Sequence, residues 1–217
     1  IADEVFTHFP FLHGIDAPMY YVALMTFVLI FSSVTMVLAV DAGHHMQKEK
    51  VAFYMLLTII GGAIFVGSQA WEWSNFIRGE YGAVETTGGQ IFQFVNEKTD
   101  KRVALKDFAI SGPSDRFQHQ INDGVWYSYE ATLPSYTVQE VISGFNSNPN
   151  LIIKTEKIDE KGHKIKLSRE ESLQKITQAK NVVEGANLVR NEYGNRLFAD
   201  FFFFITGFHG FHVFSGV

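Results

Sequence analysis

Residues 17–40, with the sequence APMYYVALMTFVLIFSSVTMVLAV, decide the fold class, because they contain no Asp, Glu, Lys or Arg. An α-helix rises about 1.5 Å per residue, so a helix over this stretch is about 36 Å long. That length crosses a hydrocarbon core of roughly 30 Å with some tilt. The sequence therefore predicts a transmembrane helix between Asp16 and Asp41.

Two further stretches have the same character. Residues 51–71 contain no charged residue, and a second transmembrane helix is expected over 51–73. A third is expected from residue 197 to the end, since no Asp, Glu, Lys or Arg follows Asp200. This last run is short for a span, and the chain begins at Ile1 without Met. We therefore expect a segment of a longer protein, with further helices on both sides.

The short flanks of the predicted helices indicate their orientation. The linker 41–50 makes the first two helices an antiparallel pair, and it contains Lys48 and Lys50, whereas residues 1–16 contain no Lys or Arg. Basic residues concentrate in cytoplasmic loops. The linker is therefore predicted to be cytoplasmic and residues 1–16 to form a lead-in on the outer face, with residues 78–196 outside.

Residues 78–196 have the composition of a water-exposed module. They hold 16 of the 18 Lys and Arg residues and 16 of the 23 Asp and Glu residues. A connection of this length is expected to have structure of its own. The chain then divides into a helix pair at 17–77, an inserted module at 78–196 and the start of a further helix at 197–217.

Local patterns predict an α+β fold for the inserted module. Alternating apolar residues predict a β-hairpin from residues 90–95 and 102–105, and a second hairpin from residues 151–154 and 164–167. The sequence Ser-Arg-Glu-Glu from Ser168 is typical of a capping box and predicts a helix to about Val183.

The overall composition excludes several classes of function. A net charge of −5 and a pI of about 5.9 disfavour a nucleic-acid partner. The absence of cysteine excludes disulfides, a thiolate nucleophile and Cys-ligated zinc, iron–sulfur or blue-copper sites. No phosphate-binding loop, nucleophilic serine motif or zinc-protease motif is present, so we assign no catalytic, cofactor-binding or metal residue to this chain.

His209 and His212 are the most informative polar residues of the predicted spans. Their spacing places them on one helix face. A bis-histidine haem needs ligands at similar depth on two helices, and His44 and His45 lie beyond the inner end of the first span. We therefore expect His209 and His212 to contact a neighbouring helix, lipid or another subunit. A proton relay is the functional alternative.

The ends of the spans carry further candidate contacts. The inner end has a His pair and a Lys that fit either a solvated turn or an anionic lipid head group. The outer end of the second span has a Gln, a Glu and a Trp, in the interfacial position that Trp favours. The candidate lipid- or subunit-contact residues are therefore His44, His45, Lys48, Gln69, Glu72, Trp73, His209 and His212.

These motifs resemble subunit III of the haem–copper cytochrome c oxidases. Family members carry Thr-Gly-Phe-His-Gly-x-His-Val in an inward-running helix, which stands here at residues 206–213. They end the preceding helix with Gln-Ala-x-Glu-Tyr/Trp, found here at 69–73, and place a His-His pair after the helix before it. A Tyr-Gly pair before the last helix matches 193–194. The resemblance covers residues 17–77 and 193–217.

The resemblance implies both a fold and a role. The three spans correspond to the fourth, fifth and sixth helices of the family's seven-helix form. The implied fold is an all-α transmembrane bundle, part of a five- to seven-helix subunit, with a small inserted α+β extramembrane module. Such a multi-pass subunit lies in the bacterial inner membrane, with its outer module in the periplasm.

The family's subunit III holds no haem or copper. It packs against subunit I, binds phospholipid, and supports proton uptake and turnover stability. Subunits I and II hold the haems and copper, and the complex reduces oxygen to water with electrons from cytochrome c while pumping protons.

Residues 78–196 replace a short outer loop of the family. Their charges balance, so we expect a docking surface for a neighbouring respiratory complex or a cytochrome c domain, and not long-range steering. Candidate edge residues are Phe92, Phe94, Val103 and Leu105; the alternative is that these residues form the module's own core.

Other classes stay open. One is subunit III of a quinol oxidase, or the related subunit of a nitric-oxide reductase, although Phe208 favours the cytochrome c type. A haem-b membrane anchor would use His209 or His212 as an axial ligand. A transporter with an exterior cap would need broken helices with polar pairs at the midplane.

Overall fold

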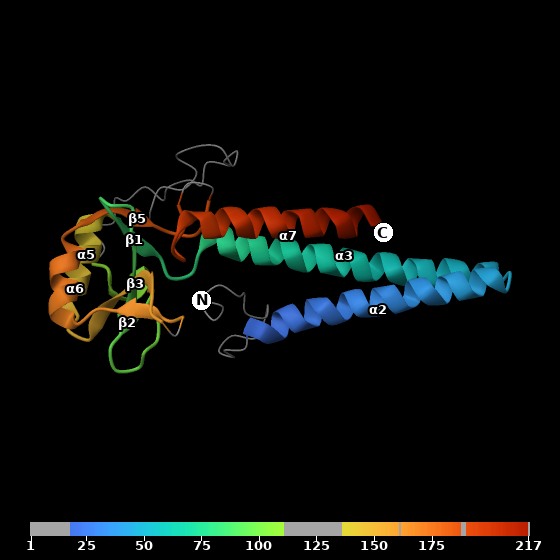
Figure 1. Ribbon diagram of the computed structural model, residues 1–217, viewed down its shortest axis with the longest axis horizontal. Coiled ribbons are helices and arrows are strands. Elements are labelled where there is room, and N and C mark those ends of the chain that lie inside the picture. The colour runs from blue at the N-terminus through green and yellow to red at the C-terminus, as the bar shows by residue number, and fades with distance from the viewer. Residues whose placement is uncertain (1–17, 111–135, 161, 188–189, 217) are drawn as a thin grey trace. The chain divides into compact units, whose positions relative to one another are not determined.

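The computed structural model describes residues 18–110, 136–160, 162–187 and 190–216 (Figure 1). The chain divides into two compact units. One is a sheet module of residues 75–201, and the other is a helical unit formed by the described residues up to Ser74 and from Phe202 onward. The predicted lead-in at residues 1–16 lies outside the described residues.

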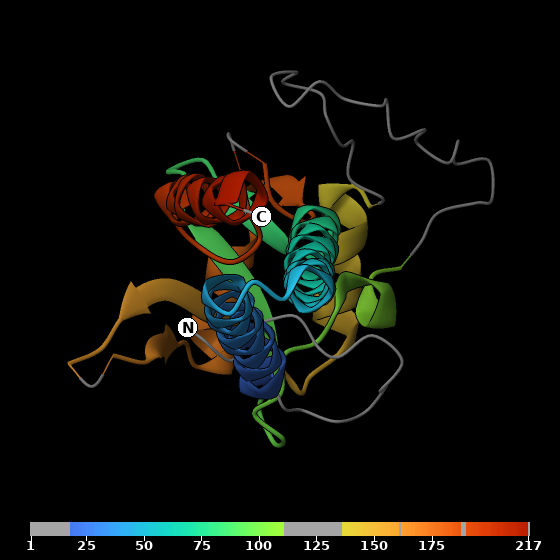
Figure 2. The same cartoon turned by 90° about the vertical axis from the view of Figure 1, so that its right-hand side faces the viewer.

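Three helices, α2 (Pro18–His44), α3 (Lys48–Arg78) and α7 (Arg196–Gly216), are long and apolar enough to cross a membrane. Figure 2 shows them nearly end-on. The three predicted transmembrane helices are thereby confirmed as helices. The chain combines them with a small antiparallel sheet, which is consistent with a partly helical membrane protein.

The connection between α2 and α3 is shorter than the predicted linker 41–50. The helices continue through most of it, because polar residues can extend a helix beyond the apolar stretch without breaking it. Only residues 45–47 separate them. Met46 takes a positive φ of 57°, and Gln47 N donates to the carbonyl of Ala42 at 3.0 Å. This is the αL turn that ends many helices.

Small and hydroxyl side chains join α2 to α3 within the helical unit. A Cβ on Gly61 would lie 3.0 Å from Ser32 Cβ, so the two backbones approach closely. Ser32 Oγ donates to the carbonyl of Thr58 at 3.2 Å, and the hydroxyls of Thr35 and Thr58 lie 2.8 Å apart. Such close contacts and interhelical hydrogen bonds are what stabilise helix pairs in lipid.

The module contains a five-stranded antiparallel sheet in the order β4-β3-β2-β1-β5. Its strands are β1 (Ala83–Thr86), β2 (Ile91–Asn96), β3 (Leu151–Ile158), β4 (Lys164–Lys166) and β5 (Ala179–Val183). The predicted hairpin from residues 151–154 and 164–167 is confirmed as β3 and β4. The edge strands are β4 and β5. Strand β5 pairs with β1, and in this register Ala83 lies opposite Val183.

The first predicted hairpin is wrong in its second strand. Residues 102–105 contribute only an isolated bridge between Val95 and Arg102, and Leu105 begins the short helix α4 (Leu105–Phe108). β2 instead pairs with β1 and β3 on its two sides. Its alternating pattern was visible locally. Its partner β1 comes directly before it in the sequence, whereas its partner β3 lies far along the chain.

The helix predicted from Ser168 to Val183 ends early. Its capping box is confirmed, with reciprocal bonds between Ser168 and Glu171, and α6 spans Arg169–Ile176. The residues after it form β5, because Val182 and Val183 fit a strand and pair with β1.

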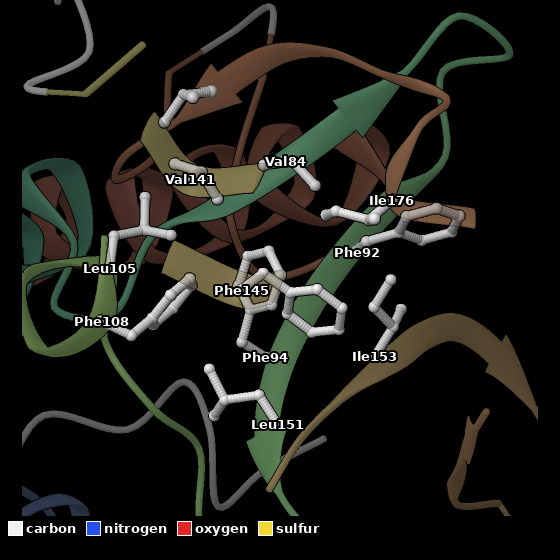
Figure 3. Packing of buried hydrophobic residues seen from close by; sticks show 11 residues of the cluster. Val84, Phe92, Phe94, Leu105, Phe108, Val141, Phe145, Leu151, Ile153 and Ile176 are labelled. Carbon is white, nitrogen blue, oxygen red and sulfur yellow. The ribbon is translucent and has the colours of Figure 1, made fainter. Parts of the chain in front are cut away.

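The module's core lies between the sheet and α5 (Val138–Ser147) and α6, which cover the same face (Figure 1). Figure 3 shows Phe94 among Phe108, Phe145 and Leu151. The docking role predicted for Phe92, Phe94 and Leu105 is wrong, since each is at most 1% exposed. Val103 packs against the same cluster. The alternative, that these side chains form the module's own core, is confirmed, since they pack with residues of α5 and α6 in one buried cluster.

Candidate functional site

The helical unit brings together the two motifs that carried the family resemblance. Trp73 lies near the end of α3, and its Nε1 donates to Thr206 Oγ1 of α7 at 2.9 Å. The Trp73 ring also meets the edge of Phe203 at a centroid distance of 5.4 Å. Gly207 permits this contact, since a Cβ there would lie 3.3 Å from the Trp73 ring. The segments 69–73 and 206–213 therefore form one site, although they are far apart in sequence.

Gln69 and Glu72 form a buried polar pair beside this contact. They are 8% and 7% exposed, and a Cβ on Gly210 of α7 would lie 3.9 Å from Gln69 Cγ. Gln69 Nε2 has no hydrogen-bond partner in the described part of the chain. Glu72 makes no hydrogen bond or ion pair with any residue that the structure describes. A group bound here would have to offer both a hydrogen-bond acceptor and a donor or positive charge.

Tyr21 of α2 closes the same end of the helical unit. It is 3% exposed, and its hydroxyl donates to the carbonyl of Ser68 at 2.9 Å. It packs with Met25 and Phe65 in a small apolar cluster. Sequence analysis missed Tyr21, since a Tyr near a membrane surface is common and only the fold shows its partner.

His209 and His212 are exposed on α7. His209 meets the edge of Phe65 at 5.3 Å with an interplanar angle of 88°, and His212 lies 6.2 Å from the Phe208 ring. Neither imidazole has a hydrogen-bond partner among the described residues. Polar groups are costly to leave against lipid, and a helix or lipid that can hydrogen-bond would satisfy them here.

The candidate residues at the α2–α3 connection are separate from this site. His44 ends α2, Lys48 begins α3, and His45 Nδ1 lies 3.0 Å from the carbonyl oxygen of Asp41. Lys48 and Glu72 are 24 positions apart on one helix, which corresponds to about 36 Å. The structure therefore separates His44, His45 and Lys48 from the other candidate residues.

No group of three or more His, Asp or Glu side chains able to hold a metal ion occurs among the residues that the structure describes. In the described helices, the two His residues of α7 have no further ligand of this kind beside them. The arrangement can bind lipid or another helix through hydrogen bonds and aromatic contacts.

A second polar cluster, which sequence analysis missed, lies inside the sheet module. Gln93, Lys164 and Glu192 are all at most 8% exposed. Lys164 Nζ donates to Gln93 Oε1 at 3.0 Å and to the carbonyl of Tyr193 at 2.8 Å. Gln93 Nε2 donates to the carbonyl of Glu192 at 2.8 Å. The sequence signal was the Tyr-Gly pair at 193–194, but nothing local marked Glu192 as buried.

Burial shapes the titration of two groups in this module. It raises the pKa of Tyr193, whose ring stacks on Phe76 at 4.6 Å, and the neighbouring Glu192 raises it further. Burial also raises the pKa of Glu156, against the opposing effects of the Ile91 amide, Lys164 and Lys157. The Oε2 atom of Glu156 is buried, and none of the residues with a described position hydrogen-bonds to it.

Comparisons with protein-family models, curated proteins and solved structures gave no significant match to this chain.

Proposed function

We propose that this chain is a segment of subunit III of a proton-pumping cytochrome c oxidase, a non-catalytic subunit that packs against subunit I. The observation that carries the proposal is the Trp73–Thr206 hydrogen bond of 2.9 Å. It joins the two segments, 69–73 and 206–213, whose motifs resemble that family.

In this role the chain supplies helix and lipid contacts, and the haems and copper belong to subunits I and II. The exposed His209 and His212 offer hydrogen bonds to a helix of a neighbouring subunit. Gln69 Nε2 presents a buried donor and the Glu72 carboxylate a buried acceptor near the outer end of α3. His44, His45 and Lys48 suit an anionic phospholipid head group at the inner end.

Purification of the tagged, full-length protein from its native membrane in mild detergent tests the proposal. We expect co-purification with a copper-containing subunit II and a haem-containing subunit I, together with oxygen consumption driven by reduced cytochrome c. Activity with quinol and not with cytochrome c would favour the quinol-oxidase alternative. A haem band that stays with this chain after the subunits are separated would favour the haem-b anchor.

Replacement of both histidines by Gln tests their assigned role. The variant His209→Gln with His212→Gln should keep the haem spectrum of the assembled oxidase and lose part of its subunit III during purification. His45→Gln, at the opposite end of the helical unit, is the matched control. Loss of a haem band in the double variant would contradict the role in subunit contact.

The sheet module is proposed to contact a neighbouring respiratory complex or a cytochrome c domain. With Phe92 and Phe94 in the core, the available apolar surface includes Ile158 and Ile165 of the β3–β4 hairpin, which are 50% and 40% exposed. The variant Ile158→Asp with Ile165→Asp should weaken that association and leave oxygen reduction intact. Unchanged association would contradict docking through this hairpin.

A further inference from the structure

The side chain of Glu192 is completely buried in the sheet module, at 0% exposure. Its Oε1 accepts hydrogen bonds from the amides of Glu80 at 3.3 Å and Tyr81 at 3.1 Å. Its Oε2 accepts from the amides of Gly82 at 3.0 Å and Gly185 at 2.7 Å. One carboxylate therefore satisfies backbone donors from two segments that lie about a hundred residues apart in the sequence.

The backbone around this carboxylate is shaped to receive an anion. Gly79, Gly82 and Gly185 have φ values of 72°, 74° and 70°, in the left-handed region that favours glycine. Successive amides in such turns point to one side and form a concave site for an anion. A Cβ on Gly79 would lie 2.2 Å from Glu192 Oε2, so a side chain there would displace the carboxylate.

Arg102 adds a positive charge to the same site. Its Nη2 lies 3.6 Å from Glu192 Oε1 and donates to the carbonyls of Glu192 at 3.0 Å and Gly82 at 3.3 Å. The guanidinium lies over the ring of Tyr81 at 4.8 Å, and its side chain is only 7% exposed. A buried carboxylate is costly unless it is paired and hydrogen-bonded, and here it has both kinds of partner.

The amides that Glu192 binds lie in the two connections between the sheet and the helices α3 and α7. Residues 79–82 run from the end of α3 to β1, and residues 184–195 run from β5 to α7. The carbonyl of Ile77, in the last turn of α3, accepts from the amide of Ala186 at 3.2 Å. Glu192 therefore links the connection from α3 to β1 with the connection from β5 to α7, next to the end of α3.

We propose that the amides of Glu80, Tyr81, Gly82 and Gly185, together with Arg102, form a carboxylate-binding site that Glu192 occupies within the chain. Its occupation fixes the sheet to the end of α3. Glu192 is a positioning residue in this scheme, and the site itself has affinity for a small carboxylate. The inference is independent of the proposed oxidase role, since it concerns only residues 77–82, 102, 185, 186 and 192.

The experiment removes the side chain and supplies the carboxylate separately. The full chain is prepared in detergent with Glu192→Ala, and with Glu160→Ala as a matched control at an exposed position of the same module. Hydrogen exchange is measured at the amides of residues 80–82 and 185, with and without acetate. Because the chain has no cysteine, spin labels at Arg78→Cys and Lys98→Cys also report the distance between the end of α3 and the sheet.

We expect Glu192→Ala to speed exchange at these four amides by about tenfold or more, since hydrogen bonds to a charged group are the stronger kind. The spin-label distance distribution should broaden. Acetate should reverse both effects, whereas chloride at the same ionic strength should not, and Glu160→Ala should behave as the parent chain.

Three results would overturn the proposal. They are unchanged exchange in Glu192→Ala, acceleration that acetate fails to reverse, and reversal by chloride to the same degree as by acetate. If Glu192→Ala does not fold, Glu192→Gln provides the second test, because it keeps the side-chain shape without the charge. Exchange should then be faster than in the parent chain, and parental exchange rates in Glu192→Gln would refute the need for a carboxylate.

Discussion

Truncation of Phe94 should strongly destabilise the sheet module. Phe94 is 0% exposed, and its ring lies 4.8 Å from the Phe108 ring and 5.6 Å from the Phe145 ring. Removal of a buried Phe side chain typically costs about 3–5 kcal/mol, from lost burial and from the cavity left behind. The cavity should stay open, because the neighbouring rings belong to separate helices and cannot all move into it.

Urea unfolding followed by a short protease pulse measures this cost in the full chain. With a urea dependence of about 1.5 kcal/mol per M, the midpoint for cleavage inside the module should fall by about 2–3 M in Phe94→Ala. Ile158→Ala is the control, since Ile158 lies on the adjacent strand β3 at 50% exposure. A small shift in Phe94→Ala, or an equal shift in both variants, would refute the core role of Phe94 and restore the docking interpretation.

Three more predictions concern other parts of the chain. Burial raises the pKa of Glu156 in the folded module. The protonated Glu156 side chain therefore contributes stability that is fully present below the unfolded pKa, about 4.3. This stability is lost as the pH rises through the folded pKa. The stability of the parent chain relative to Glu156→Gln should therefore fall with rising pH in unfolding curves, and a rise would contradict the burial effect. Gly61→Leu should separate α2 from α3 and lower the melting temperature in detergent, because even a Cβ at this position would lie 3.0 Å from Ser32. Gly67→Leu is the control, since a side chain there faces open space and should have little effect. Equal melting temperatures would argue against this helix contact. Ser168→Ala removes the capping bonds of α6 and should cost about 1 kcal/mol in urea unfolding; no loss would mean that the box does not stabilise the helix.

The three long apolar helices could be predicted from the sequence because their signal is local. Long stretches without charge define α2, α3 and α7, and no distant residue is needed to recognise them. The helix ends were less predictable. Charged residues such as Asp41 and Lys48 mark the edge of the apolar stretch, but the helical hydrogen bonding of α2 and α3 includes them.

The sheet was predictable only where its strands are neighbours in sequence. The β3–β4 hairpin was predicted, because a short polar turn links two strands. The pairing of β1 with β5 was not, since it joins residues about a hundred positions apart and gives no local pattern. The same limit explains the error in α6, whose first turn has a local capping signal while its end depends on β5 finding β1.

The candidate site shows the same division. The residues Trp73 and His209 could be chosen from short motifs, but the partner of Trp73 is Thr206, and only the fold brings them within 2.9 Å. Glu192 was not chosen at all. A single Glu in a polar segment is usually exposed, and its burial depends on three glycine turns that converge from distant positions.

The pairing of β1 with β5 has a consequence for how such a chain can evolve. Ala83 and Val183 are opposite each other in the register, and Cα atoms in such pairs lie about 5 Å apart. The segment of about a hundred residues between them therefore begins and ends at adjacent positions of the strand pair. A gene can gain or lose a segment with adjacent ends without altering the geometry of the polypeptide that flanks it. Related proteins that differ only by this segment, with a tight turn in its place, are therefore expected to share the same helices.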